Sequence, residues 1–204
     1  MATGLTLIEN TLPTLVIASH NAGKIAEFER ILSGWWRIQP QATLGVAAVE
    51  ETGLSFIENA ILKARHACLE TGHAALADDS GLVVPALDGA PGLHSARYSG
   101  SGDDGNNTLL LSNMRGLQGE ERAAFYIAVL VLMRGPEDPA PIVTEGRWHG
   151  HVAEVPRGDG GFGYDPLFIP RGEKRHAAEL YPDEKDKVSH RGLAVAQLLS
   201  HFGE

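Results

Sequence analysis

Two adjacent carboxylates, Asp78 and Asp79, follow a short apolar segment in the middle of the chain and precede Ser80 and Gly81. Carboxylates at the end of a buried strand need a partner, because an isolated buried charge is costly. A divalent cation such as Mg²⁺, which prefers oxygen ligands, could be that partner. Successive side chains of a strand point to opposite faces, so at most one of the two is expected to face a given site. The same four residues also suit a surface turn.

A second candidate site follows the apolar residues 14–18, where a short polar loop leads into a helical pattern at Lys24. Free backbone N–H groups and the helix dipole favour an anion at such a helix start. Asn21 can cap the helix, Gly23 allows a close approach, and Lys24 adds positive charge. The loop differs from a Walker A motif, which has Ser or Thr after the lysine. It also fits an ordinary strand-to-helix turn. The acidic residues 50–51 could complete a metal site with Asp79.

Two segments near the C-terminus could bind an aromatic or polar ligand. Gly158, Gly160 and Gly163 formally match the dinucleotide-binding glycine pattern, but the segment runs into an Asp-Pro pair and opens no helix, which argues against that function. Phe162 on this loop could instead stack on a nucleobase, or serve as core of a hairpin. Residues 185–192 form a basic helix start, which the helix dipole disfavours and which therefore points to a ligand.

Alternating strand and helix patterns predict an α/β fold in one domain. Short apolar segments predict strands over residues 14–18, 35–39, 74–77, 123–133 and 142–149. Helical periodicity predicts helices over residues 24–32, 55–70, 106–114 and 189–199. Ser55 and Ser189 suit the N-cap positions of two of them, and Leu193, Ala196 and Leu199 are expected to face the core. The clustered strands after residue 123 indicate a mixed sheet.

The bulk properties exclude several kinds of partner. The chain has 204 residues, one cysteine and a formal net charge of −9, which argues against nonspecific nucleic-acid binding. No apolar run approaches the roughly 20 residues of a membrane helix. Residues 1–13 lack the pattern of a signal peptide and are expected to form an N-terminal extension. We therefore expect a cytoplasmic protein without a membrane or nucleic-acid partner.

Six segments together resemble the Ham1-like inosine triphosphate pyrophosphatase family. They are residues 19–24, 50–60, 77–82, 89–98, 161–166 and 189–192. The resemblance implies an elongated α/β fold, in which helices flank a mixed sheet and two lobes enclose a central substrate cleft. It implies a homodimer that hydrolyses ITP, dITP and XTP to the monophosphate and pyrophosphate with Mg²⁺, which clears deaminated purines from the nucleotide pool.

The resemblance also implies roles for matching residues. Asp79 would be the catalytic base and, with Glu50, a metal ligand, while Lys24 would stabilise charge on the phosphates. The implied substrate-binding residues are Ser19, His20, Asn21, Ala22, Gly23 and Lys24 at the triphosphate, Ser80 beside it, and Phe162, Gly163, Tyr164, Asp165, Lys185, His190 and Arg191 at the base. A 6-keto purine can accept a hydrogen bond from His190 or Arg191, whereas the 6-amino group of adenine cannot.

Two other functions also fit. A purine-nucleotide sensor without turnover would use Phe162, Lys185 and Arg191 but would not need Glu50 and Asp79 together. A Maf-like pyrophosphatase for other modified nucleotides is the second, and the purine-directed residues 161–166 and 189–192 argue against it.

Overall fold

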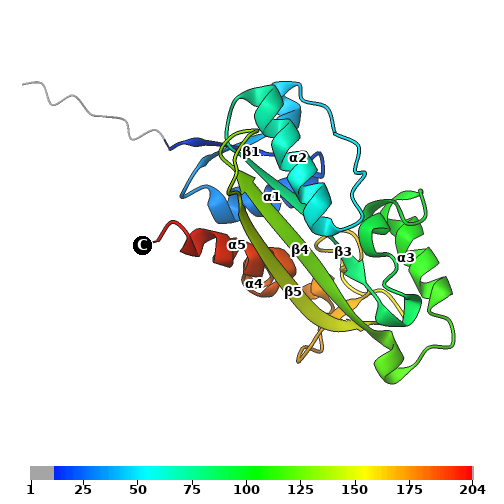
Figure 1. Ribbon diagram of the computed structural model, residues 1–204. Coiled ribbons are helices and arrows are strands. Elements are labelled where there is room, and N and C mark those ends of the chain that lie inside the picture. Colours follow the sequence, from blue (N-terminus) through cyan, green and yellow to red (C-terminus); the bar gives the residue numbers. More distant parts are fainter. Residues whose placement is uncertain (1–11, 204) are drawn as a thin grey trace, which may run out of the picture.

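A computed structural model describes residues 12–203, which are built on one six-stranded mixed sheet (Figure 1). Its strands, in spatial order, are β2 (Arg37–Pro40), β1 (Thr14–Ile17), β3 (Ala75–Val83), β4 (Ala123–Met133), β5 (Ile142–Val152) and β6 (Phe168–Pro170). β1 pairs in parallel with β2 and β3, and the remaining neighbours are antiparallel. The predicted mixed α/β sheet is therefore confirmed.

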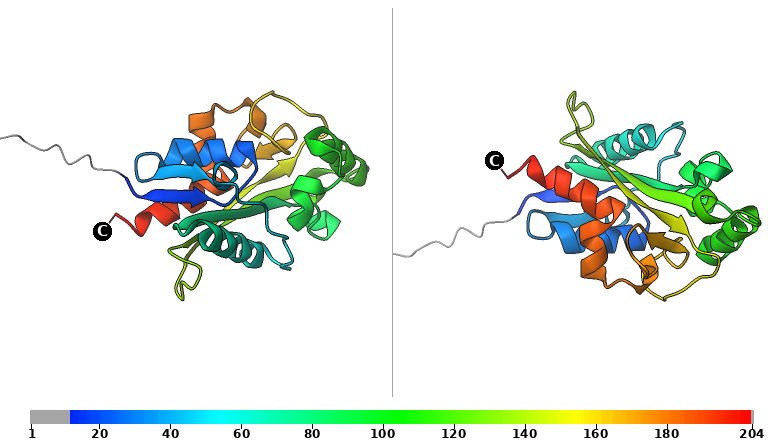
Figure 2. Two further views of the ribbon diagram at one scale, coloured as in Figure 1. Left: turned by 90° about the horizontal axis from the view of Figure 1, so that it is seen from above. Right: turned by 90° about the horizontal axis from the view of Figure 1, so that it is seen from below.

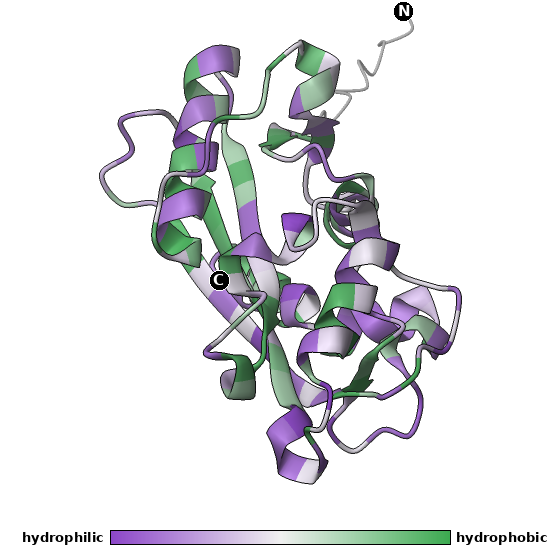
Figure 3. Ribbon diagram, turned by 90° about the vertical axis from the view of Figure 1, so that its right-hand side faces the viewer, coloured by the Kyte–Doolittle hydropathy of each residue, from purple (hydrophilic) through white to green (hydrophobic). Residues whose placement is uncertain are grey.

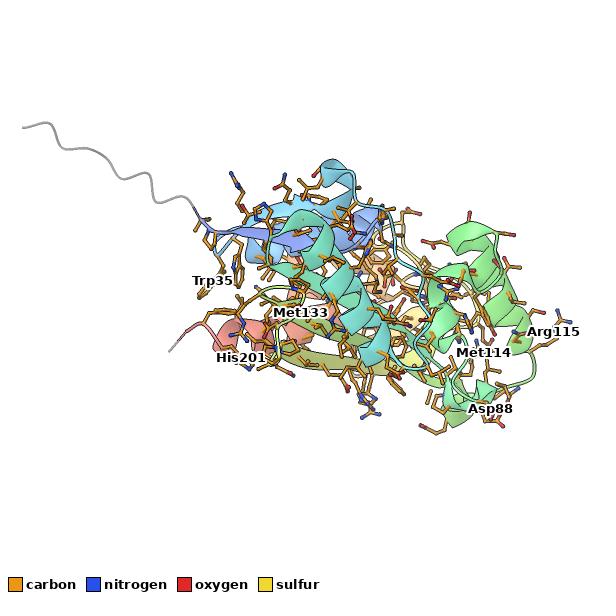
Figure 4. All side chains as sticks on the ribbon, turned by 45° about the horizontal axis from the view of Figure 1, so that its top comes forward. Trp35, Asp88, Met114, Arg115, Met133 and His201 are labelled. Atoms are coloured by element: carbon orange, nitrogen blue, oxygen red, sulfur yellow. The ribbon has the colours of Figure 1, made fainter. Side chains whose placement is uncertain are left out.

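Helices cover both faces of the sheet. α1 (Ala22–Leu32), α4 (Pro182–Val188) and α5 (His190–Ser200) lie on one face, and α2 (Phe56–Thr71) lies on the other (Figure 2). α3 (Gly102–Asn113) lies toward one end of the long strands. Short 3-10 helices connect these elements: η1 (Gln41–Leu44), η2 (Pro85–Leu87), η3 (Gly92–Arg97), η4 (Gly119–Arg122) and η5 (Ala177–Glu179). The molecule is elongated, with Trp35 and His201 near one end and Asp88 and Arg115 near the other (Figure 4).

The hydrophobic core has three parts. Ala60 and Ala64 of α2 pack on one face of the sheet, while Phe28 of α1 and Leu198 of α5 pack on the other. A third cluster fills the end near α3, where Tyr126, Trp148 and Phe168 meet. The helices alternate between hydrophilic and hydrophobic segments, as expected for helices that bury one side (Figure 3). Within residues 12–203, the helices are all too short or too polar to cross a bilayer.

The strand predicted over residues 74–77 is too short. β3 continues to Val83, so that Asp78, Asp79 and Ser80 are strand residues with register partners on β4. The surface turn that these residues also suit is thereby excluded. The polar segment stays in the sheet because its two carboxylates find cationic partners on both faces. The sequence pattern cannot reveal those partners.

Two further expectations need correction. α3 begins at Gly102, four residues before the predicted start. α5 begins after the expected N-cap Ser189, but it buries Ala194, Val195 and Leu198, whereas Leu193 and Ala196 are exposed. The face of α5 is determined by its close approach to β5 at Gly146, where a Cβ atom would overlap the backbone of His190. Of the expected N-terminal extension, residues 1–11 lie outside the described residues.

Candidate active site

The loop between β1 and α1 forms one wall of a polar pocket of about 550 Å³. Ser19 Oγ accepts a hydrogen bond from the backbone N–H of Asn21 at 3.1 Å. The Asn21 side chain is the N-cap of α1 and accepts from the Lys24 backbone N–H at 3.0 Å, as predicted. These contacts order the loop at the N-terminus of α1. The helix dipole, free backbone N–H groups and Lys24 make this end of the helix positive. We call this pocket the polar pocket.

The two neighbouring aspartates of β3 serve opposite faces of the sheet. Asp79 points to the face covered by α2, where its Oδ1 accepts from Lys63 Nζ at 2.7 Å and its Oδ2 from Asn59 Nδ2 at 3.3 Å. Asp78 points to the face of α1 and α5, where it pairs with Lys24 at 3.0 Å and with Arg191. The expectation that at most one of the two faces a given site is confirmed.

Lys63 links Asp79 to a second carboxylate. Its Nζ donates to Glu51 Oε1 at 2.9 Å as well as to Asp79, and Glu51 Oε2 accepts from Arg97 at 2.9 Å. Burial raises the pKa of the Asp79 carboxyl, although Lys63 opposes this. Two carboxylates therefore converge on one cation beside the polar pocket. Glu50 lines the same pocket from an exposed position.

Lys63 had no assigned role in the sequence interpretation, and Glu51 was named only within the acidic residues 50–51 that could complete a metal site with Asp79. The sequence does contain a pattern that could have indicated Lys63. Asn59 and Lys63 are four residues apart and therefore lie on the same side of α2. Asn59 is buried in this helix, and its oxygen also accepts from the backbone N–H of Gly53 at 2.8 Å. Two polar side chains on the sheet-facing side of a helix indicate a buried polar partner.

On the opposite face, six side chains form an ionic network in which all but the partly exposed Lys24 are buried. Arg191 donates to Asp78 and Glu27, and its Nη2 donates to Ser80 Oγ at 3.0 Å. Lys185 donates to Glu27 at 3.0 Å and to Asp165 at 2.6 Å. The network consists of Lys24, Glu27, Asp78, Asp165, Lys185 and Arg191.

The cations of this network keep two of its carboxyls ionised. Burial would raise the pKa of Asp78, but Arg191 and Lys24 outweigh burial and hold that pKa well below its usual range. Arg191 and Lys185 likewise lower the pKa of Glu27 despite its burial. Each carboxylate and each cation is thus compensated within the network.

A smaller pocket of about 130 Å³, which we call the aromatic pocket, adjoins this network. The Phe162 ring lies 4.9 Å from Lys185 Nζ and 5.8 Å from the Arg191 guanidinium carbon. The ring also packs directly on Gly23, where a Cβ atom would lie 2.6 Å from it. The glycine of the first loop therefore leaves space for the aromatic ring of the second.

His190 stacks on Tyr126 in the aromatic pocket, with ring centroids 4.6 Å apart and planes at 8°. Burial and the nearby Arg191 charge hold its pKa well below the usual value, so the imidazole is neutral. Among the described residues, its Nδ1 has no hydrogen-bond partner although the atom is buried. A buried polar atom without a partner is costly, and the residue that carries this one lines the aromatic pocket.

The sequence-derived residues gather around these two pockets. Ser19, His20, Asn21, Lys24 and Glu50 line the polar pocket. The aromatic pocket is lined by Ser80, Phe162, Gly163, Tyr164, Asp165, Lys185, His190 and Arg191. Asn21 and Lys24 line both, so the pockets adjoin at the start of α1. Ala22, Gly23 and Asp79 are not among the lining residues of either pocket: Ala22 and Gly23 begin α1 at this junction, and Asp79 contacts Lys63, which lines the polar pocket.

Residues 15–201 match the Ham1 family, and the chain belongs to that family. A dITP/XTP pyrophosphatase from Xanthomonas oryzae is 54% identical over 187 residues, which cover 90% of this chain and 94% of that protein. A dITP/XTP pyrophosphatase from Methylococcus capsulatus is 49% identical over 191 residues, which cover 92% and 95%.

The fold agrees with solved structures of Ham1 proteins. The structure of a HAM1 protein from Coxiella burnetii has a TM-score of 0.85 and 43% sequence identity, covering 94% of this chain and 98% of that one. The Ham1 protein of Staphylococcus aureus has a TM-score of 0.81 at 36% identity, covering 93% and 97%.

Proposed function

We propose that this chain hydrolyses ITP, dITP and XTP to the nucleoside monophosphate and pyrophosphate. The main observation in support of this proposal is that the two pockets adjoin, because Asn21 and Lys24 line both of them. A polar pocket at a helix start suits a triphosphate, and an adjoining aromatic pocket suits a purine base. Relatives about half identical to this chain are dITP/XTP pyrophosphatases, which supports the same reaction here.

Asp79 is the candidate general base. Its carboxylate contacts Lys63, which lines the polar pocket, and burial raises the pKa of Asp79, which makes the carboxylate a better proton acceptor. It would take a proton from a water molecule that attacks the α-phosphorus in line, because the products are a monophosphate and pyrophosphate. Lys24 would stabilise the negative charge that develops on the departing pyrophosphate.

The carboxylates of Asp79 and Glu51 suit a hard divalent cation. Both accept from the single ammonium of Lys63, at 2.7 and 2.9 Å, so their oxygens already converge on one positive charge. Among residues 12–203, no three His, Cys, Asp or Glu side chains gather into a metal cluster. One or two carboxylates with substrate phosphates are typical of Mg²⁺. Glu50, which lines the same pocket, remains a further candidate ligand. A bound Mg²⁺ would neutralise and orient the phosphates.

His190 and Arg191 would read the purine. The neutral His190 carries one ring N–H that can donate to the 6-keto oxygen of hypoxanthine or xanthine, and Arg191 lines the same pocket. The 6-amino group of adenine is itself a hydrogen-bond donor and cannot accept from the His190 N–H, which disfavours ATP. Phe162 offers a ring on which the base can stack. Since the ring packs on Gly23, the base and phosphate parts of the site are in direct contact.

The homodimeric state implied by the family resemblance and the cytoplasmic location expected from the bulk properties are part of this proposal. Size-exclusion chromatography with light scattering measures the first directly. The net charge of −9 is consistent with a partner that is a small nucleotide rather than a nucleic acid.

Product analysis tests the reaction. Purified protein is incubated with ITP, XTP, GTP or ATP, each with Mg²⁺ and with a chelator, and pyrophosphate and orthophosphate are measured separately. We expect metal-dependent pyrophosphate from ITP and XTP, and little from GTP and ATP. Orthophosphate as the direct product would contradict attack at the α-phosphorus. Tight ITP binding without turnover would instead support a purine-nucleotide sensor.

A further inference from the structure

The loop that carries Phe162 has a backbone that needs support from outside. Gly158, Gly161 and Gly163 all have positive φ, at 81°, 71° and 64°. Glycine-rich backbone loses more conformational entropy on ordering than other backbone. An aromatic ring on such a loop keeps a fixed orientation only where neighbouring elements hold the loop on both sides.

The inner side of the loop is tied to the ionic network. Asp165 Oδ2 accepts from the backbone N–H of Phe162 at 2.9 Å and from Lys185 Nζ at 2.6 Å. This contact fixes one end of the Phe162 peptide to the body of the sheet, but it leaves the next residue, Gly163, to be held from elsewhere.

The outer side of the loop is tied to α3 through Gly163. Asp103 Oδ2 accepts from the Gly163 backbone N–H at 2.7 Å, and Asn107 Nδ2 donates to the Gly163 carbonyl oxygen at 2.9 Å. Asp103 and Asn107 are four residues apart in one helix, so they reach the loop from the same side. Both polar backbone groups of one glycine are therefore held by a single turn of α3.

The two side chains are themselves held in place. Asn107 Nδ2 also donates to the backbone carbonyl of Asp103 at 3.0 Å, which links the pair. Asp103 lies in the first turn of α3, where the helix dipole favours a carboxylate. It also lines the aromatic pocket with Phe162. The pair is thus an ordered support directly beside the proposed base site.

We propose that Asp103 and Asn107 are positioning residues that hold Phe162 at the angle in which it stacks on the purine. This inference rests on the proposed function and adds two residues that act on the base through Gly163. Their loss loosens the aromatic platform without touching the carboxylates at the phosphates. Affinity for ITP and discrimination between purines then decrease, while turnover at saturating ITP is retained.

The test compares Asp103→Ala and Asn107→Ala with Asp104→Ala, which removes an exposed acid from the same helical turn. Steady-state kinetics with ITP and GTP are measured for each, with melting temperatures as a check of folding. For Asp103→Ala we expect KM for ITP to rise about tenfold, as for the loss of one charge-assisted hydrogen bond. The value of kcat changes little, and the ratio of kcat/KM for ITP to that for GTP falls. Asp104→Ala behaves as the wild type.

Two further variants separate positioning from a general structural effect. Asp103→Asn keeps an acceptor oxygen for the Gly163 N–H and is expected to retain most of the affinity. The double alanine variant is expected to raise KM by less than the product of the single effects, because both side chains hold one residue. If Asp103→Ala fails to fold, KM and purine selectivity of Asn107→Ala and Asp103→Asn are compared with those of the wild type instead.

The outcomes distinguish this inference from the proposed function. A wild-type protein that does not hydrolyse ITP overturns the function and the inference with it. An active wild type with unchanged KM and purine selectivity in both alanine variants overturns the positioning role alone. So does a fall in kcat in folded variants without a rise in KM.

Discussion

Asp78 and Asp79 are adjacent on β3, yet their carboxylates reach opposite faces of the sheet and meet different cations. Asp78 pairs with Lys24 and Arg191 inside the ionic network, and Asp79 pairs with Lys63 beneath α2. Cationic partners hold the pKa of Asp78 well below its usual range, whereas burial raises the pKa of Asp79. The two aspartates are therefore expected to differ in role, the first structural and the second chemical.

Asp79→Asn should abolish turnover and largely spare ITP binding. The amide has nearly the same shape but cannot accept the proton of the attacking water. Because the ionised Asp79 is disfavoured by burial, its removal should change the free energy of unfolding by about 1 kcal/mol or less. Turnover assays and calorimetric ITP titration check both parts. Full activity in this variant would rule out Asp79 as the base.

Asp78→Asn should destabilise the fold by about 3 kcal/mol, the cost of removing one partner from a buried ion pair. Its side chain is fully buried, and its loss leaves Lys24 and Arg191 without a shared counter-charge. Urea unfolding followed by circular dichroism gives the measurement, with Asp79→Asn as the neighbouring control. Equal stabilities of the two variants would refute the division of roles.

Stability should fall in mild acid because of Glu27 and Asp78. Both pKa values are lowered by folding, so their contribution is complete above the unfolded values of about 4.3 and 3.9. It is lost as pH falls further and the folded carboxyls take up protons. We expect a nearly constant free energy of unfolding from these groups between pH 7 and about 5.5, with a decline below about pH 5.

Glu27→Gln should make this acid dependence shallower, since one of the two linked carboxyls is gone. Glu70→Gln, which changes an exposed residue at the end of α2, is the matched control. The comparison uses urea unfolding at a series of pH values. An acid dependence that is the same in Glu27→Gln and in the wild type would show that the network does not cause it.

Gly23→Ala should weaken ITP binding because the new methyl group would lie 2.6 Å from the Phe162 ring and must displace it. Helix propensity acts in the other direction, since alanine is favoured over glycine within α1 by about 1 kcal/mol. We therefore expect a higher KM for ITP without loss of melting temperature. Gly34→Ala, where a Cβ would meet nothing within 4 Å, should leave both unchanged. Unchanged KM in Gly23→Ala would indicate that the ring moves freely.

Local signals in the sequence were sufficient for several elements. Asn21, Ser55 and Ser189 are the N-caps of α1, α2 and α5, because capping depends on a hydrogen bond within one helical turn. The mixed sheet followed from the clustered apolar segments and is also confirmed. Residues 162–165 of the glycine-rich segment line one pocket together with Lys185, His190 and Arg191 of the basic segment.

The remaining features depend on contacts between distant segments. The polar end of β3 is stabilised by Lys63 on the preceding helix and by Arg191 on α5, which lies far away in the sequence. α5 buries Arg191 completely, so its inward face includes a guanidinium that a hydrophobic pattern treats as exposed. The late predicted start of α3 left Asp103 in a loop and hid its helical relationship to Asn107.

The ionic network also constrains how this chain can diverge. Its three acids and three bases sum to zero formal charge, and each contacts more than one neighbour or anchors the end of the chain of contacts. A lone substitution strands an ion away from water, whereas a charge-preserving pair does not. Substitutions in this network are therefore expected mainly as compensating pairs. The six positions should change together rather than one at a time.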